Sequence, residues 1–284
     1  MNTTSASMEH TPGALRRAAR PIKSRWRRFM CAATERWISS GRAYDILVLI
    51  GMRRSGNHLA INWILGQVPG SAVFYNNIRK TAHPFDVGMR EYRVRFPNTR
   101  PKIILSYEDL PPSDIMAGPL PAFLSDRVSR HGARVMTGVI LRDPYNLFAS
   151  RMKKWPERFE TDAQVEAQQM LFNTHASLAL APEPVFGDAP VIPILYNQLV
   201  SDEDYRAKLS KKLNINAGNV GLDDVPVYGH GSSFDGYQTQ GSDVRAGVFD
   251  RWRAQKDDPR FRAIVADARI QTAAQALFDM GAPD

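Results

Sequence analysis

Residues 46–58 read Ile-Leu-Val-Leu-Ile-Gly-Met-Arg-Arg-Ser-Gly-Asn-His. The five apolar residues at the start are typical of a short buried strand, and the residues from Asn57 onward have the apolar pattern of a helix. A strand that turns through such a loop into a helix can surround an anion with backbone N–H groups and the positive end of the helix dipole. The stretch therefore predicts a phosphate-binding cradle.

The cradle differs from the P-loop of a nucleoside-triphosphate enzyme after its second glycine. A P-loop continues with Lys and then Ser or Thr, whose hydroxyl holds Mg²⁺. Here both glycines keep the P-loop spacing, but Asn and His follow, and two arginines place positive charge inside the turn. We therefore predict a site for a phosphate-bearing donor that is bound without a triphosphate–metal complex. The predicted donor-binding residues of this first cradle are Arg53, Arg54, Ser55, Gly56, Asn57 and His58.

The positive charge of the chain is concentrated near its N-terminus. The 284 residues carry a formal net charge of +8. Residues 1–42 hold nine Arg or Lys and two Glu, a balance of +7, which leaves +1 for residues 43–284. A general nucleic-acid binder would carry its basic patch on the folded surface, so we expect no nucleic-acid partner. We predict a basic leader over residues 1–42 and one domain over residues 43–284.

Two interpretations of the leader stay open. It is either a partly disordered or loosely packed basic segment, or residues 25–38 form an interfacial helix on an anionic membrane. The sequence contains no run of 18 apolar residues, so it predicts no membrane-spanning helix. It also lacks the apolar core of a signal peptide. The single cysteine, Cys31, suits a reducing compartment. We expect a cytoplasmic protein, with peripheral membrane contact under the second interpretation. The apolar residues of the segment are Trp26, Phe29, Met30, Trp37 and Ile38.

Short apolar runs alternate with longer amphipathic stretches along the domain. This alternation predicts a three-layer α/β/α fold with a central, mainly parallel, P-loop-like sheet that binds ligands at the carboxyl ends of its strands. The Gly- and Ser-rich stretch 223–247 predicts a long functional or mobile loop. The predicted strands are Ile46–Ile50, Ala72–Tyr75, Lys102–Ser106, Val135–Leu141 and Val191–Tyr196. The predicted helices are Asn57–Leu65, Tyr145–Lys154, Asp162–Ala181, Asp202–Leu213 and Phe261–Met280.

A second anion-binding motif follows the strand that ends at Leu141. Arg142 follows that strand, Asp143 can cap the next helix, and Pro144 can occupy the first turn of that helix. An arginine fork together with the hydroxyl of Ser150 would bind a second phosphate, separate from the first. The alternative is a structural ion pair of Arg142 beside a capped helix.

Together, the two motifs resemble those of the cytosolic and Golgi sulfotransferase family, whose donor is 3′-phosphoadenosine 5′-phosphosulfate (PAPS). In that family a loop of the type Pro-Lys-Ser-Gly-Thr holds the 5′-phosphosulfate, and a later Arg-Asp-Pro followed by Ser holds the 3′-phosphate. Residues 54–56 are similar to the first motif, with Arg in place of Lys. Arg142 and Ser150 match the second at the family's spacing. Leu59 stands where many members carry an adenine-stacking Trp.

Two weaker similarities to the family follow in the same order. The segment around Tyr196 resembles one whose tyrosine lies near adenine. The segment that contains Arg245 and Gly247 resembles one that closes over the nucleotide. The resemblance thus spans roughly residues 46–252.

The resemblance implies a sulfotransferase domain over residues 43–284. Such an enzyme moves a sulfuryl group from PAPS to the hydroxyl of a saccharide, a lipid, or a small alcohol or phenol, without a metal. No group of His, Cys, Asp and Glu has metal-ligand spacing. Two alternatives are a non-catalytic nucleotide-binding protein and a kinase-like phosphotransferase on the same cradle. The acceptor and the oligomeric state stay open.

Sulfuryl transfer resembles phosphoryl transfer, because the enzyme mainly positions the reactants and stabilises spreading charge. Arg54 is the candidate that stabilises the leaving oxygens, and His58 can share that role. Cytosolic members use a His after the third strand as the base, but that place holds no His here. We favour Glu108 as the catalytic base. The alternatives are Asp109, His83 and His230.

Overall fold

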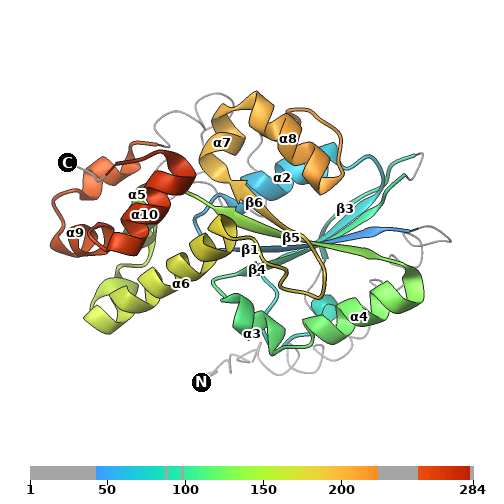
Figure 1. The fold of residues 1–284 in the computed structure, drawn as a ribbon, viewed down its shortest axis with the longest axis horizontal. Coiled ribbons are helices and arrows are strands. Elements are labelled where there is room, and N and C mark those ends of the chain that lie inside the picture. The colour runs from blue at the N-terminus through green and yellow to red at the C-terminus, as the bar shows by residue number, and fades with distance from the viewer. Residues whose placement is uncertain (1–42, 87–88, 97–98, 223–248, 282–284) are drawn as a thin grey trace, which may run out of the picture.

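The computed structural model of the chain describes residues 43–86, 89–96, 99–222 and 249–281. A six-stranded sheet forms its centre, in the order β3-β2-β4-β1-β5-β6 (Figure 1). Five strands run parallel, and β3 pairs antiparallel with β2 at the edge. This architecture confirms the predicted α/β fold with a mainly parallel sheet. The strands are β1 (Asp45–Gly51), β2 (Ala72–Tyr75), β3 (Met89–Arg93), β4 (Lys102–Glu108), β5 (Arg134–Leu141) and β6 (Val191–Leu195).

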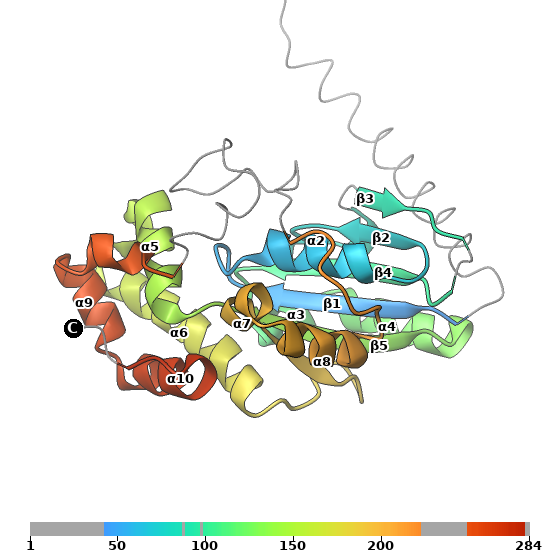
Figure 2. The same ribbon diagram turned by 90° about the horizontal axis from the view of Figure 1, so that it is seen from above.

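Helices cover both faces of the sheet and one of its ends (Figures 1 and 2). One face carries α2 (Asn57–Gln67), α7 (Tyr196–Ser201) and α8 (Glu203–Leu213), and the other carries α3 (Pro112–Met116) and α4 (Leu120–His131). The remaining helices gather at the end of the sheet where β1 finishes. They are α5 (Pro144–Lys154), α6 (Asp162–Leu180), α9 (Pro259–Val265) and α10 (Ala268–Phe278).

The central strand β1 supplies side chains to both layers of the core. Successive strand residues point to opposite faces, so Ile46, Val48 and Ile50 pack in one hydrophobic cluster with residues of α3 and α4. Leu47 and Leu49 pack in another cluster with residues of α2 and α8. Because both faces are covered, the strand is apolar throughout rather than alternating, which is why it stands out in the sequence.

Most predicted elements agree with the structure to within two residues at each end, and two of them need correction. The strand predicted to include Tyr196 ends at Leu195, and Tyr196 begins α7. The helix predicted over Phe261–Met280 is two helices. The carboxylate of Asp267 interrupts it by capping α10, because it accepts hydrogen bonds from the backbone N–H of Arg269 at 2.8 Å and of the next residue at 3.3 Å.

The strand β3 and the helices α3, α4 and α7 were not predicted from the sequence. Within the described ranges, no helix is long and apolar enough to cross a membrane. The predicted leader over residues 1–42 and the whole of the predicted loop over residues 223–247 lie outside those ranges.

Candidate functional site

The predicted site residues gather at the carboxyl edge of the sheet. Gly51 at the end of β1 pairs with Glu108 at the end of β4. The neighbouring strand β5 ends one residue before Arg142, and β6 ends one residue before Tyr196. Because these strands are parallel, their ends meet at one edge, where α/β folds bind ligands.

The first cradle is a tight turn with two residues in the left-handed region. Arg54 has φ 77° and Gly56 has φ 84°. A side chain at Gly56 would also collide with a neighbour, since its Cβ would lie 2.0 Å from Cδ2 of Tyr196. The glycine is therefore required by both backbone and packing. The turn leads directly into α2, whose N-terminus faces the same edge of the sheet.

A buried hydroxyl inside this cradle has no hydrogen-bond partner within the described residues. It belongs to Ser55, which is fully buried. Beside it, the side chain of Asn57 donates from Nδ2 to the backbone oxygen of Met52 at 3.2 Å. An unsatisfied buried polar atom is costly unless something else satisfies it. An oxygen-rich anion held in the cradle would supply an acceptor for this hydroxyl.

A hydrogen bond joins the two cradles. Nε of Arg54 donates to Oγ of Ser150 over 3.0 Å. Burial lowers the pKa of the Arg54 guanidinium, and the positive charges of Arg142, Arg251 and Arg151 lower it further. Four guanidinium groups therefore concentrate positive potential at this edge. Such a cluster is stabilised by a bound anion.

The second motif folds as predicted at its helix start. The carboxylate of Asp143 caps α5 by accepting the backbone N–H of Asn146 at 2.8 Å, and Pro144 occupies the first turn. Arg142 is 4% exposed, and its guanidinium carbon lies 5.2 Å from the ring centre of Tyr196. That ring therefore lies next to both Gly56 of the first cradle and Arg142 of the second.

The side chain of Asn146 connects α5 to the chain near residue 250. Its Nδ2 donates to the backbone oxygen of Phe249 at 2.8 Å, and its Oδ1 accepts the backbone N–H of Trp252 at 3.2 Å. These bonds bring Arg251 to the site, although the sequence did not single it out as a site residue. The only signal was its place in the segment compared with the family's closing segment.

A small apolar cluster adjoins the two cradles. It contains the side chains of Leu59, Tyr196, Val200 and Phe249. The position of Leu59, where the family often has Trp, is therefore still part of an apolar surface beside the cradles. Its aromatic rings come from α7 and from the segment that Asn146 fixes.

The carboxylate of Glu108 contacts the first cradle directly. Its Oε1 accepts from Nδ2 of Asn57 at 3.0 Å, and its Oε2 lies 3.4 Å from Nε of Arg53. Arg53 also donates to Oδ1 of Asn77 at 2.9 Å. The side chain of Glu108 is 7% exposed. These contacts hold a carboxylate directly beside the first cradle.

Asp109 lies beside Glu108 but faces a different set of partners. Its Oδ1 accepts the backbone N–H of Arg53 at 2.9 Å and NH1 of Arg151 at 2.7 Å, and its Oδ2 accepts NH1 of Arg158 at 3.1 Å. Burial alone would raise the pKa of the Asp109 carboxyl, but the charges and hydrogen bonds of Arg151 and Arg53 together outweigh it and hold the pKa below its usual value. Three cationic or N–H donors occupy Asp109, which makes it a poor proton acceptor.

Arg151 is a site residue that the sequence reasoning missed. It is fully buried, and its NH1 also donates to the backbone oxygen of Arg53 at 2.9 Å. Arg151 and Asp109 together bind both the N–H and the C=O of Arg53, which fixes the loop just before Arg54. The only signal in the sequence was its position directly after Ser150.

The other predicted residues have separate surroundings. Nε2 of His58 lies 3.4 Å from Nδ2 of Asn76, next to the first cradle. His83 packs edge-on against the rings of Phe85 and Phe123, at 5.6 and 5.4 Å between centres, on the α4 side of the sheet. His230, Arg245 and Gly247 lie outside the described residues. Among the described residues, no group of three or more His, Cys, Asp or Glu is placed to hold a metal ion.

No protein-family model and no curated protein matches the chain. Among solved structures, the crystal structure of mouse sulfotransferase SULT7A1 complexed with PAP is similar, at 14% sequence identity and a TM-score of 0.40. The match covers 84% of this chain and 86% of that chain. A similarity this low assigns neither a function nor a ligand.

Proposed function

We propose that the chain is a sulfotransferase that moves a sulfuryl group from PAPS to a hydroxyl acceptor. The observation that carries the proposal is the hydrogen bond between Arg54 and Ser150, since it joins two anion-binding motifs in one site. A donor with a 5′-phosphosulfate and a 3′-phosphate presents two separate anionic groups. A donor with a single chain of phosphates does not.

The residues present fit such a donor. The 5′-phosphosulfate would lie in the first cradle, where the buried hydroxyl of Ser55 needs an acceptor. The 3′-phosphate would bind Arg142 and Ser150, with Arg251 adding positive charge nearby. The apolar cluster of Leu59, Tyr196, Val200 and Phe249 would pack against the adenine.

The proposed reaction is an in-line displacement at sulfur. The acceptor oxygen forms a new bond to sulfur, the bond between sulfur and the 5′-phosphate oxygen breaks, and adenosine 3′,5′-diphosphate leaves. Glu108 takes the proton of the acceptor hydroxyl. Arg54, with His58 beside the cradle, stabilises the charge that develops on the leaving phosphate oxygens. Asp109 is assigned to loop positioning rather than to proton transfer.

Two other functions compete with this one. A kinase-like phosphotransferase would need another cation in place of the P-loop Lys and another ligand in place of its Mg²⁺-binding hydroxyl. A non-catalytic nucleotide-binding protein would need no carboxylate beside the cradle, whereas Glu108 contacts the cradle through Asn57 at 3.0 Å. That contact favours an enzyme.

The proposal is tested by transfer of radiolabelled sulfate from PAPS to a panel of saccharide, lipid and small phenol or alcohol acceptors. The Glu108→Gln variant serves as the inactive control, and Arg262→Ala, an exposed arginine on α9, as the active one. We expect transfer to at least one acceptor class with the native chain and with Arg262→Ala, but not with Glu108→Gln. Transfer of labelled phosphate from ATP to the same panel, without sulfate transfer, would favour the phosphotransferase instead.

A further inference from the structure

A groove of about 850 Å³ lies at the edge of the sheet opposite to the cradles. It is lined by α4, the start of β5, the segment 186–190 and the end of α8. Asp45, the first residue of β1, belongs to its wall, whereas the first cradle follows the last residue of that strand. A strand of this length separates the two places by roughly 20 Å. The groove is therefore distinct from the candidate active site.

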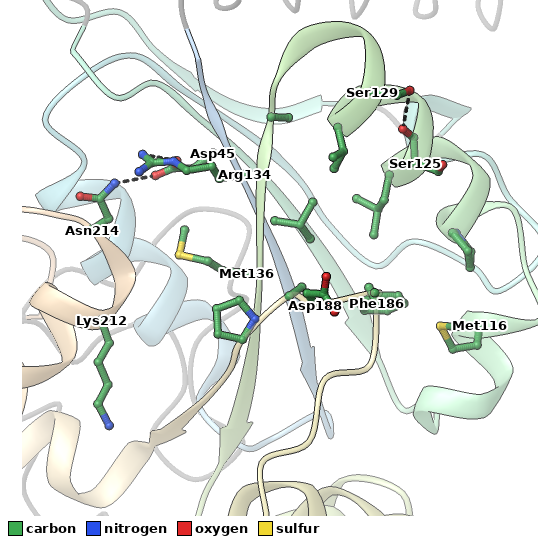
Figure 3. A pocket seen from close by; sticks show the side chains of 18 of the residues that line it. Asp45, Met116, Ser125, Ser129, Arg134, Met136, Phe186, Asp188, Lys212 and Asn214 are labelled. Carbon is green, nitrogen blue, oxygen red and sulfur yellow. Dashed lines mark hydrogen bonds and ion pairs between the residues drawn. The ribbon is translucent and has the colours of Figure 1, made fainter.

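The walls of the groove are mainly apolar. Leu124 and Phe186 are buried in it, while Met116 is 42% and Val128 48% exposed. Figure 3 shows Met136 between the group of Asp45 and Arg134 on one side and Phe186 and Met116 on the other. Exposed apolar side chains around a hollow are typical of a surface that a partner covers.

The wall also holds the charged residues Asp45, Arg134, Asp188, Lys211 and Lys212, and the buried one, Asp45, is already satisfied within the fold. Oδ1 of Asp45 accepts Nε of Arg134 at 2.9 Å, and its Oδ2 accepts Nδ2 of Asn214 at 3.1 Å. Lys102, fully buried, forms an ion pair with the same carboxylate. The carboxylate of Asp45 is therefore occupied by partners within the fold. Asp188, Lys211 and Lys212 are exposed, and the mainly apolar part of the wall suits apolar side chains of an occupant.

The leader enters the domain at the wall of this groove. Tyr44 is fully buried, and its backbone oxygen accepts the N–H of Arg134 at 3.0 Å, so the chain is fixed against the start of β5. Trp37 lies eight residues before Asp45. Eight residues span about 12 Å as a helix and up to about 26 Å when extended. The apolar residues of the leader are thus within reach of the groove.

The apolar side chains of the leader have the spacing of a helix that lies in a groove. Trp26, Phe29 and Met30 are three and four residues apart, with arginines between them. Such anchors place apolar side chains on one face and basic ones on the other. A groove of this size falls within the range of about 300–1,000 Å³ that encloses drug-sized molecules, so it can take more than one large side chain.

We propose that residues 26–38 of the leader dock in this groove and cover Met116 and Val128. The leader is then held at the amino edge of the sheet, away from the cradles, which leaves the carboxyl edge open to donor and acceptor. This docking is independent of the reaction proposed for the cradles. An anionic membrane surface and the groove of a second copy are the competing destinations of the leader.

The lone cysteine of the chain allows a direct test in the full-length protein. Cys31 lies inside the proposed docking segment, so Val128→Cys on the rim supplies a partner for it. A disulfide needs Cα atoms about 4.4–6.8 Å apart. Thr272→Cys, at an exposed position on α10, is the matched control. Both proteins are treated with a mild oxidant at low concentration, and the cross-links are identified by mass spectrometry of non-reduced digests.

We expect the internal disulfide to form at least about tenfold faster with Val128→Cys than with Thr272→Cys, because docking raises the effective concentration of Cys31 at the rim. Adding Trp37→Ser to the first variant should slow it by about tenfold, since an aromatic anchor is lost outside the domain core. Equal rates in the two variants, or disulfides between molecules only, would overturn the proposal. Loss of the internal disulfide when the protein co-sediments with phosphatidylserine vesicles would overturn it in favour of the membrane.

Discussion

Nε of Arg54 donates a hydrogen bond to Oγ of Ser150 over 3.0 Å, across 96 positions of the sequence. Arg54 belongs to the turn after β1, and Ser150 lies on α5 after β5. Because β1 and β5 are parallel neighbours, their carboxyl ends lie side by side and the two motifs meet. This contact makes one site of two anion-binding segments.

The first prediction concerns the second cradle. Arg142→Ala removes a charged fork, so affinity for adenosine 3′,5′-diphosphate should fall by about 10- to 100-fold, as expected for a charge-assisted hydrogen bond. Affinity for adenosine 5′-phosphosulfate, which lacks the 3′-phosphate, should change little. Titration calorimetry with both ligands measures the difference. If both affinities fell equally, Arg142 would not be specific for the 3′-phosphate.

The second prediction separates the charge of Arg54 from its strained backbone. An L-residue at φ 77° is held at a cost of about 1–2 kcal/mol, which glycine does not have. Arg54→Gly should therefore keep or raise the melting temperature while turnover falls by about 10²–10³-fold. Steady-state kinetics and thermal unfolding are measured on the same preparations. Arg54→Lys retains charge and should keep more of the turnover than Arg54→Gly; an unchanged turnover in the glycine variant would remove Arg54 from the reaction.

The third prediction assigns different roles to two neighbouring acids. Glu108→Gln should lower turnover by about 10²-fold or more and leave donor binding within about twofold, because only the proton acceptor is lost. Asp109→Asn should instead destabilise the fold by about 3 kcal/mol or more, because the buried guanidinium of Arg151 loses its charged partner. Urea unfolding and kinetics of both variants distinguish these outcomes. A stable, inactive Asp109→Asn would move the base to Asp109.

Asp109 also makes the unfolding free energy depend on pH, in a direction that its pKa shift fixes. The pKa of Asp109 is lower in the folded protein than its usual value of about 3.9, so the folded state favours the charged form. Its stabilisation is complete above about pH 4 and is lost as the pH falls through the folded pKa. Unfolding free energies of the native chain should drop over that acid range. Asp109→Asn should show a smaller drop, and an equal one would contradict the assignment.

The fourth prediction concerns His175, which is fully buried on α6 with Nε2 3.0 Å from the backbone oxygen of Leu110. Burial lowers its pKa. Below about pH 6.5 the unfolded chain therefore binds a proton that the folded chain does not, and stability falls as the pH is lowered, by up to about 1.4 kcal/mol per pH unit. Chemical unfolding between pH 5 and 7 measures this slope. His175→Gln should flatten this slope, whereas His131→Gln, at an exposed position, should leave it unchanged. A slope that persists in His175→Gln and flattens in His131→Gln would contradict the assignment to His175.

The five parallel strands were predictable because buried strands in such a sheet are continuously apolar. The strand β3 was not, since Met89–Arg93 is an antiparallel edge strand with charged residues and lacks that signature. The first cradle and Arg142 were also predictable, because local spacing encodes a loop followed by a helix. Arg151 and Arg251 were not, because their roles depend on which segments meet in the fold. The groove at Asp45 likewise arises only when α4, β5 and α8 come together.

The most direct test of the central claim is thermal unfolding with adenosine 3′,5′-diphosphate compared with ATP and Mg²⁺. A site built from the two cradles joined by Arg54 and Ser150 should prefer the ligand with two separated phosphate groups. At about 100 times its dissociation constant, the diphosphate should stabilise the folded protein by about 2.7 kcal/mol. ATP with Mg²⁺ at the same concentration should give far less. Equal stabilisation by the two ligands, or none by the diphosphate, would contradict the account.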